Sequence, residues 1–228
     1  MSPESVVYCE GYYDRSFLSG WLLHVGCRDL KGDTRRQNDL WGKPVKGAGH
    51  FAFESRGGLP VRVVPCDGDA KILDAARERL RQAKVAPLTR VVVCFDSDAN
   101  AGDDTTARSL DAFPREHPSA AAIVWKSTEP AGVPGIPDKQ TLERLACGAI
   151  LAAHPARASA LVPWIDSIPA DPTHHHKAHA WSLMAGWHPG DGCDRFYRAL
   201  WEDPGVAKEL EDRLRAAGAW DVLDAIAS

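Results

Sequence analysis

Several features that would assign the chain to a familiar chemical class are missing from its sequence. The six cysteines include no Cys-x-x-Cys pair, which excludes the usual zinc-ligand spacing and a secretory disulfide framework. No apolar run approaches the roughly 20 residues that a membrane-spanning helix needs, and no basic segment at the N-terminus leads into an apolar stretch. These absences predict a reduced, soluble, cytoplasmic protein with no membrane contact.

Common catalytic signatures are missing as well. No Gly-x-Ser-x-Gly elbow indicates a serine hydrolase, and no P-loop or Gly-x-Gly-x-x-Gly follows the first predicted strand. The histidines His174 to His176 have no cysteine or acid at ligand spacing, so a solvated loop or helix start is expected there. The 27 Lys and Arg against 31 Asp and Glu leave a net charge of −4, which argues against a passive, strongly basic nucleic-acid binder.

Short apolar runs alternate with helical patterns over the first half of the chain. Strands are expected at residues 5–9, 61–64, 90–95 and 120–125, and Asp14 and Asp69 are expected to cap helices after the first two. The run at 90–95 has no polar residue after Arg90, as in parallel strands covered on both faces. This alternation predicts an α/β fold, a doubly wound parallel sheet of about four strands flanked by helices.

Two segments interrupt this pattern. Residues 27–58 are rich in glycine and basic residues and are interpreted as an inserted excursion, with a short strand at His50–Glu54. Its basic residues and Trp41 either grip phosphates and stack on a base or form an ordinary solvated surface. Prolines and glycines over 130–137 mark a boundary. The predicted organisation is an α/β domain over 1–129 and a helical C-terminal region over 130–228 packed on it.

Acidic residues follow two of the expected strands directly. Glu10 comes after the first strand, and Asp96 and Asp98 come after the third. Ligands of open α/β sheets gather outside the carboxyl ends of the strands, and carboxylate oxygens suit Mg²⁺ or Mn²⁺. Clustered carboxylates repel one another, so a cation would stabilise them. The sequence therefore predicts a divalent metal site made by Glu10, Asp96 and Asp98.

These segments resemble a known pattern. Val-Val-Tyr-Cys-Glu10-Gly11-Tyr-Tyr-Asp14, followed by Val-Val-Val-Cys-Phe-Asp96-Ser-Asp98-Ala-Asn-Ala-Gly102, is similar to the TOPRIM domain over roughly residues 5–126. That domain is shared by topoisomerases, bacterial primases, the ribonuclease that matures 5S ribosomal RNA and the overcoming-lysogenization-defect nucleases. The resemblance implies that Glu10 acts in acid–base catalysis near the metal and that Asp96 and Asp98 bind Mg²⁺.

The nuclease-type members of that family add a further glutamate and a lysine. Glu143, at the start of the helix after the boundary, and Lys177 occupy comparable places, so the resemblance implies a metal-binding role for Glu143 and an assisting role for Lys177. The chain departs from the family at Asn100, where another acid is common, and has nothing like the topoisomerase tyrosine domain or the primase zinc module. The implied activity is a Mg²⁺-dependent nuclease or other phosphodiester-processing enzyme, a hydrolase acting on DNA or RNA.

Two other interpretations are open at this point. A catalytically silent TOPRIM-like scaffold would bind a protein or nucleic-acid partner, or a second copy of the chain. A receiver domain with a phosphorylated aspartate would need paired acids after the first strand and a lysine after the last. Lys126 does follow the fourth expected strand, but Glu10 is a single acid, which ranks the receiver lowest.

Overall fold

The central element of the fold is a six-stranded mixed sheet with the strand order β2-β3-β4-β1-β5-β6. The computed structural model describes residues 3–30, 51–84, 87–98, 110–167, 182–183, 186 and 193–228. The strands are β1 (Glu4–Cys9), β2 (Arg28–Asp29), β3 (Phe51–Glu54), β4 (Pro60–Pro65), β5 (Leu88–Asp96) and β6 (Ala120–Trp125). The strands β4, β1, β5 and β6 are parallel, and β2 and β3 extend the sheet in antiparallel fashion.

The four expected strands are thus present and parallel, but the prediction of a wholly parallel sheet of about four strands needs correction. A tight connection joins β3 to β4, in which the Ser55 amide donates to the Leu59 carbonyl at 2.8 Å. Gly58 makes this turn possible because it adopts a φ of +79°. The hairpin places β3 antiparallel to β4, and β2 pairs with β3 in turn.

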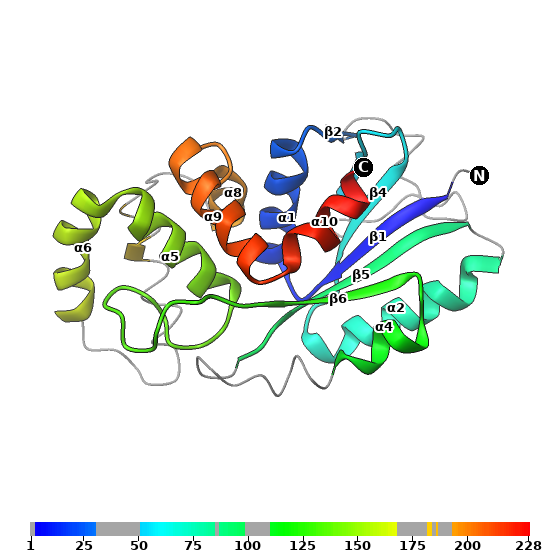
Figure 1. Cartoon of the computed structure of the whole chain (residues 1–228), viewed down its shortest axis with the longest axis horizontal. Coiled ribbons are helices and arrows are strands. Elements are labelled where there is room, and N and C mark those ends of the chain that lie inside the picture. Colours follow the sequence, from blue (N-terminus) through cyan, green and yellow to red (C-terminus); the bar gives the residue numbers. More distant parts are fainter. Residues whose placement is uncertain are drawn as a thin grey trace.

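Helices cover both faces of the sheet and one of its ends (Figure 1). The helices are α1 (Tyr12–His24), α2 (Ile72–Arg81), α4 (Ala112–Glu116), α5 (Leu142–Ala153), α6 (Pro155–Ser167), α8 (Cys193–Ala199), α9 (Pro204–Ala216) and α10 (Ala219–Ala227). In Figure 1 the helices α1, α8, α9 and α10 lie above the sheet, α2 and α4 lie below it, and α5 and α6 lie beyond the ends of the strands. None of the helices in the described segments is long and apolar enough to cross a lipid bilayer.

The core divides into two layers because successive strand residues point to opposite faces. Val7 and Cys9 of β1 pack against α1 and the C-terminal helices, whereas Val6 and Tyr8 pack against α2. All residues of β1 are buried, which fits the unbroken apolar run from Val6 to Cys9 in this central strand.

Aromatic side chains connect α1 to the C-terminal helices. The ring of Phe17 lies 5.2 Å from that of Trp201, and the ring of Trp21 lies 6.0 Å from that of Trp220. The two helices α1 and α8 approach so closely that a Cβ on Gly20 would lie 2.6 Å from the Arg198 carbonyl oxygen. The described C-terminal helices therefore share one apolar core with the sheet.

The amino end of β1 carries a buried ion-pair triad. The carboxylate of Glu4 lies 3.3 Å from Arg62 Nε and 3.3 Å from Arg79 Nε, and Glu4 is only 4% exposed. Arg79 also donates to the Pro87 carbonyl at 3.1 Å. Buried carboxylates are tolerated when they are paired in this way.

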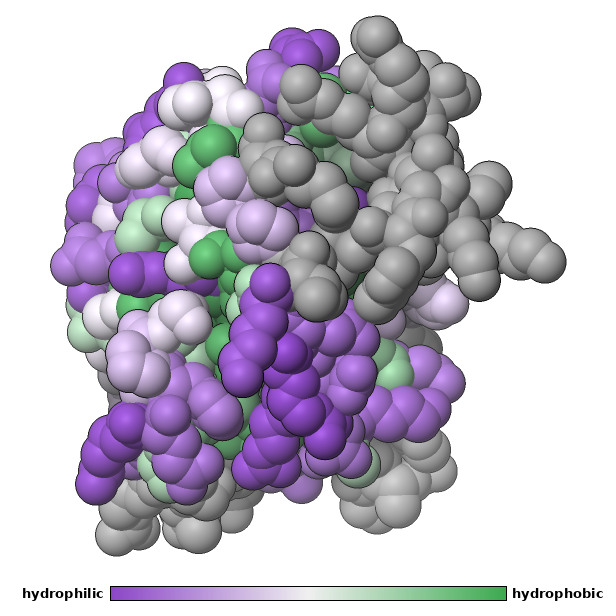
Figure 2. Space-filling view, turned by 90° about the vertical axis from the view of Figure 1, so that its right-hand side faces the viewer, coloured by the Kyte–Doolittle hydropathy of each residue, from purple (hydrophilic) through white to green (hydrophobic). Residues whose placement is uncertain are grey.

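Figure 2, which views the end where β1 begins, shows mainly hydrophilic residues over the lower half of the described surface.

Candidate functional site

Four carboxylates from separate segments of the chain lie near the carboxyl ends of β1 and β5, close enough for their charges to act on one another. Glu10 follows β1, Asp14 lies in the first turn of α1, Asp96 ends β5, and Glu143 lies in the first turn of α5. We call these residues, Glu10, Asp14, Asp96 and Glu143, the acidic cluster. It forms where the parallel strands end and α5 begins (Figure 1).

Asp14 ties two parts of the cluster together. Its Oδ1 accepts a hydrogen bond from Trp125 Nε1 at 2.7 Å, and its Oδ2 accepts one from the Gly11 amide at 3.2 Å. The expectation that Asp14 caps the helix is confirmed in part: Gly11 is the N-cap residue, and Asp14, three residues later, accepts the Gly11 amide as the N3 residue of a capping box. Asp14 also fixes the turn after Glu10 against the last residue of β6.

Asp96 links β5 to the beginning of α5. Its Oδ1 accepts a hydrogen bond from the Leu142 amide at 2.8 Å, so Asp96 satisfies a helix amide that the cap residue Thr141 leaves without a side-chain partner. Trp125 lies opposite Asp96 in the β5–β6 register. This arrangement places Glu143, one residue after Leu142, beside the strand end.

The cluster carries negative charge in a buried place. Burial is the main cause that raises the pKa of Asp14 to about 7; the hydrogen bond from Trp125 opposes this rise, and the charges of Glu143 and Glu10 add to it. Burial also raises the pKa of Asp96 well above its usual range, and the charges of Asp14, Glu143 and Glu10 raise it further. A divalent cation would relieve this repulsion.

Two buried hydroxyls border the cluster without a hydrogen-bond partner within the described part of the chain. They belong to Tyr197 of α8, which is fully buried, and to Thr141, which is 2% exposed. Burial raises the pKa of the Tyr197 phenol above its usual range, and so do the charges of Glu143, Cys147, Asp14 and Asp96. The charges of these acids thus reach the phenol, although it makes no hydrogen bond with them.

These oxygen groups fit a hydrated hard cation better than a closed metal site. Across the described ranges, no group of three or more His, Cys, Asp or Glu side chains is arranged to hold a metal ion. Mg²⁺ usually keeps several of its waters and takes only one or two carboxylates from the protein. The carboxylates and the unpaired hydroxyls match that mode of binding, in which water bridges the ion to part of the site.

The predicted site residues fall into three groups. Glu10 and Glu143 lie close enough to Asp96 for their charges to act on it. Asp98 is exposed, its φ is +50°, and its charge is not among the main causes that raise the pKa of Asp96. Lys177 and the histidines 174–176 lie outside the described residues.

Sequence reasoning missed Asp14 and Tyr197 as members of this site. Asp14 stands four residues after Glu10, about one helical turn away, and this spacing was the available signal. Tyr197 had no local signal, because α8 reaches the cluster only through the tertiary packing of the helices. Its ring stacks on that of Tyr13 with 5.2 Å between centroids.

The loop before α5 is held by a buried arginine. Arg144 is fully buried and donates to the carbonyls of Pro137, Glu129 and Pro130, the last at 3.0 Å. Gln140 accepts from the Ser127 amide at 2.9 Å and donates to the Ser127 carbonyl at 3.1 Å. These bonds give α5, and with it Glu143, a defined place at the end of the sheet.

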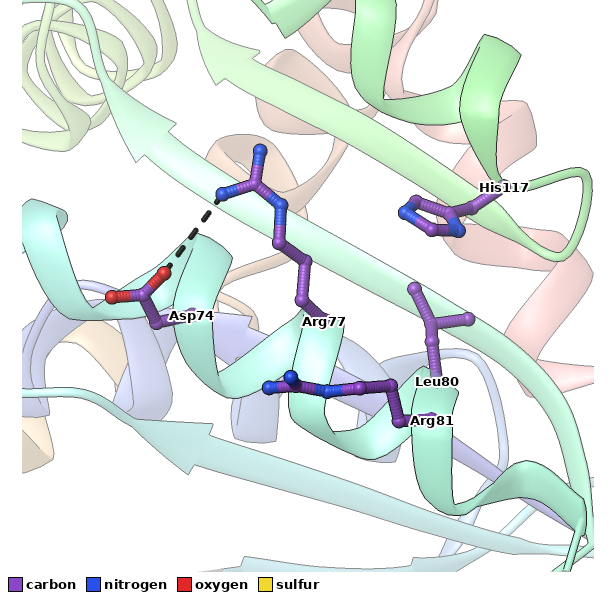
Figure 3. Close-up of a pocket in the computed structure, with 5 residues that line it drawn as sticks. All are labelled: Asp74, Arg77, Leu80, Arg81 and His117. Atoms are coloured by element: carbon purple, nitrogen blue, oxygen red, sulfur yellow. Dashed lines mark ion pairs between the residues drawn. The ribbon is translucent and has the colours of Figure 1, made fainter.

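A separate cavity of about 660 Å³ lies on the face of the sheet that α2 and α4 cover (Figure 3). It is lined by Asp74, Arg77, Leu80, Arg81 and His117. Its arginines have carboxylate partners on α2 itself: Arg77 lies 3.8 Å from Asp74, and Arg81 lies 2.7 Å from Glu78. The cavity is wide open, and none of the acidic cluster lines it. The acidic cluster is therefore the better candidate for a functional site.

Comparison with known proteins identifies the fold class. No protein-family model matches the chain, and no curated protein is significantly similar to it in sequence. A crystal structure of a hypothetical protein from Pyrococcus horikoshii OT3 superposes with a TM-score of 0.67 at 15% identity, covering 99% of this chain and 100% of that one. At this identity the likeness concerns the fold alone. The chain is an α/β protein whose fold recurs over the whole length of that protein.

Proposed function

We propose that the chain is a Mg²⁺- or Mn²⁺-dependent enzyme that processes phosphodiesters, namely a nuclease acting on DNA or RNA. The observation that carries this proposal is the acidic cluster, in which burial, and after it the charges of the neighbouring acids, raise the pKa values of Asp14 and Asp96. Such repulsion destabilises a fold unless a ligand offsets it, and active sites are where it is commonly found. The resemblance to TOPRIM domains supports the same proposal.

The residues of the cluster would divide the work. Asp96 and Glu143 would hold the cation, and Asp98 and Lys177 belong to the same proposal through the TOPRIM resemblance. The bound cation would neutralise charge on the phosphate and orient a water molecule. Glu10 is half-buried and so can exchange protons with solvent. It would take the proton from the attacking water or return one to the leaving oxygen. Asp14 holds the turn that carries Glu10.

A catalytically silent scaffold is the second candidate function. It is favoured by the absence, among the described residues, of a group of acids or histidines already arranged to hold a metal ion. A scaffold of this kind would bind a protein or nucleic-acid partner without cleaving it. The experiment below separates the two candidates.

The nuclease proposal is tested by cleavage of single-stranded, duplex and structured DNA and RNA in Mg²⁺ or Mn²⁺. We expect Glu10→Gln to lower the cleavage rate by about a hundredfold or more, because general acid–base catalysis contributes about 10²–10⁴-fold. Glu78→Gln is the matched control, since Glu78 pairs with Arg81 on α2, outside the cluster. Equal cleavage by wild type and Glu10→Gln, or none by wild type, would contradict the proposal.

Removing the Tyr197 hydroxyl tests whether it serves the site rather than the fold. We expect Tyr197→Phe to raise the free energy of unfolding of the metal-free protein by about 1 kcal/mol, because a buried hydroxyl without a partner is destabilising. The same substitution should weaken Mn²⁺ binding about tenfold, the range seen when groups behind metal ligands are removed. Urea unfolding in EDTA and Mn²⁺ titration measure the two effects. A loss of stability with unchanged Mn²⁺ affinity would assign the hydroxyl to the fold.

A further inference from the structure

Tyr12 is an exposed aromatic residue beside the acidic cluster. It begins α1, only Gly11 separates it from Glu10, and 53% of its surface is exposed. Within the described residues only Trp164, on α6, is a comparably exposed large apolar side chain. Single exposed aromatics are common on protein surfaces, so the surroundings of Tyr12 decide what it does.

A buried cation supports one side of the Tyr12 ring. The guanidinium carbon of Arg15 lies 4.8 Å from the centroid of the Tyr12 ring and 4.0 Å from the centroid of the Phe51 ring of β3. Arg15 itself is only 5% exposed. It therefore contacts both rings, and its attraction to the Tyr12 ring favours one orientation of that ring. More than half of the Tyr12 surface stays open to solvent.

A nucleobase is the ligand that these surroundings favour. A restrained aromatic ring offers a flat surface on which any base can stack, and its place two residues from Glu10 would put a stacked nucleotide next to the phosphate-processing groups. A protein or lipid partner would need a wider apolar surface, whereas the neighbours of Tyr12 here include Glu10 and Arg15. A base inside a duplex is already stacked and paired, so an unpaired base fits best.

We propose that Tyr12 is a stacking platform for an unpaired nucleobase of the substrate, and that the substrate class is therefore single-stranded or frayed nucleic acid. This inference rests on the proposed function, because it takes the acidic cluster to act on the neighbouring phosphate. Arg15 is a positioning residue here, since it acts on the base only through the Tyr12 ring.

The test is a binding cycle that needs no cleavage. Wild type, Tyr12→Ala, Tyr12→Phe and the control Trp164→Ala are titrated, in EDTA and in Ca²⁺, with fluorescent oligomers of equal length. The oligomers are single-stranded thymidine, single-stranded uridine, a fully abasic strand and a blunt duplex. The first two separate DNA from RNA, and the abasic strand keeps the phosphates but offers no base to stack.

We expect Tyr12→Ala to weaken binding of a base-bearing single strand about tenfold, as the loss of one stacked base does, and to leave the abasic strand and the duplex unchanged. Tyr12→Phe keeps the ring and should bind within about twofold of wild type, as should Trp164→Ala. Equal effects of Tyr12→Ala on the base-bearing and abasic strands, or no binding of single strands by wild type, would overturn the inference. If Tyr12→Ala weakens binding of base-bearing strands alone but the protein cleaves nothing, stacking is upheld and the nuclease proposal is rejected. If cleavage depends on Glu10 but Tyr12→Ala does not weaken binding in this way, the nuclease proposal is upheld and stacking is rejected.

Discussion

Replacing Asp96 by asparagine should lower cation-dependent cleavage by at least about a hundredfold while making the metal-free protein more stable. Asparagine keeps an oxygen in place of Oδ1, so the hydrogen bond from the Leu142 amide can persist. The substitution removes a negative charge from a place where burial and the charges of Asp14, Glu143 and Glu10 all oppose ionisation. Each pKa unit of such opposition corresponds to about 1.4 kcal/mol, so we expect a gain of at least about 1 kcal/mol at pH 8.

The same reasoning gives a pH dependence with a definite sign. The pKa of Asp14 is raised from 3.8 to about 7, and that of Asp96 is also raised, so the folded protein binds these protons more tightly than the unfolded chain does. This contribution to stability is fully present below the ordinary carboxyl pKa and is lost as the pH rises through the folded pKa. The metal-free wild type should therefore lose stability between about pH 4 and pH 7, and Asp96→Asn should lose less.

Urea unfolding in EDTA across this pH range, together with cleavage assays in Mg²⁺, checks the Asp96 prediction. Asp74→Asn is the matched control: it removes an exposed carboxylate on α2 that lies 3.8 Å from Arg77, outside the acidic cluster. We expect it to leave both stability and cleavage nearly unchanged, because surface pairs contribute little. If the metal-free Asp96→Asn variant unfolds more easily than wild type at pH 8, the prediction is wrong, because the protein itself would then stabilise the charge of Asp96.

Replacing Gly20 by alanine should destabilise the fold by about 2–3 kcal/mol. A Cβ at this position would lie 2.6 Å from the Arg198 carbonyl oxygen and 2.9 Å from the Arg198 Cα. Both are backbone atoms of α8, so a side-chain rotation cannot relieve the clash and the two helices must separate. The loss outweighs the advantage of about 1 kcal/mol that alanine normally has over glycine inside a helix.

Ser19→Ala is the control for this prediction because it changes the neighbouring residue of the same helix. The Ser19 hydroxyl is buried and has no hydrogen-bond partner among the described residues, so its removal should be neutral or slightly stabilising. Urea unfolding of both variants measures the difference. Since α1 carries Asp14 and α8 carries Tyr197, Gly20→Ala should also weaken Mn²⁺ binding. A Gly20→Ala variant as stable as Ser19→Ala would mean that the helices are not in close contact.

Hydrophobic patterning predicted the four parallel strands but not how the sheet continues beyond β4. Each of β1, β4, β5 and β6 contains a compact, mainly apolar run, which can be recognised without knowledge of its neighbours. The short strand expected at His50–Glu54 is present as β3 (Phe51–Glu54), but its antiparallel pairing with β4 and the two-residue strand β2 that pairs with it were not predicted. Pairing of this kind depends on tertiary structure, which local patterns do not record.

The residues of the candidate site were also predicted only in part. Glu10 and Asp96 were predictable because acids at the ends of parallel strands meet at one edge of the sheet. Asp98 was expected beside Asp96, but the positive φ at Asp98 turns the chain after β5, and Asp98 is exposed. From the sequence, Asp14 is expected only to cap a helix. Its bond to Trp125 and the charges of Glu143 and Glu10 that act on it show that it belongs to the cluster.

The buried triad of Glu4, Arg62 and Arg79 gives β1 two ends of opposite character. At the amino end a buried glutamate has its counter-charges within the protein, 3.3 Å away on each side. At the carboxyl end burial, and after it the charges of neighbouring acids, raise the pKa of Asp14 and Asp96. The charge at the first end is paired within the protein, whereas the protonation of Asp14 and Asp96 at the second end depends on pH. The two ends of β1 therefore differ in how the charge of their buried acids is balanced: by neighbouring arginines at one end, and by protonation at the other.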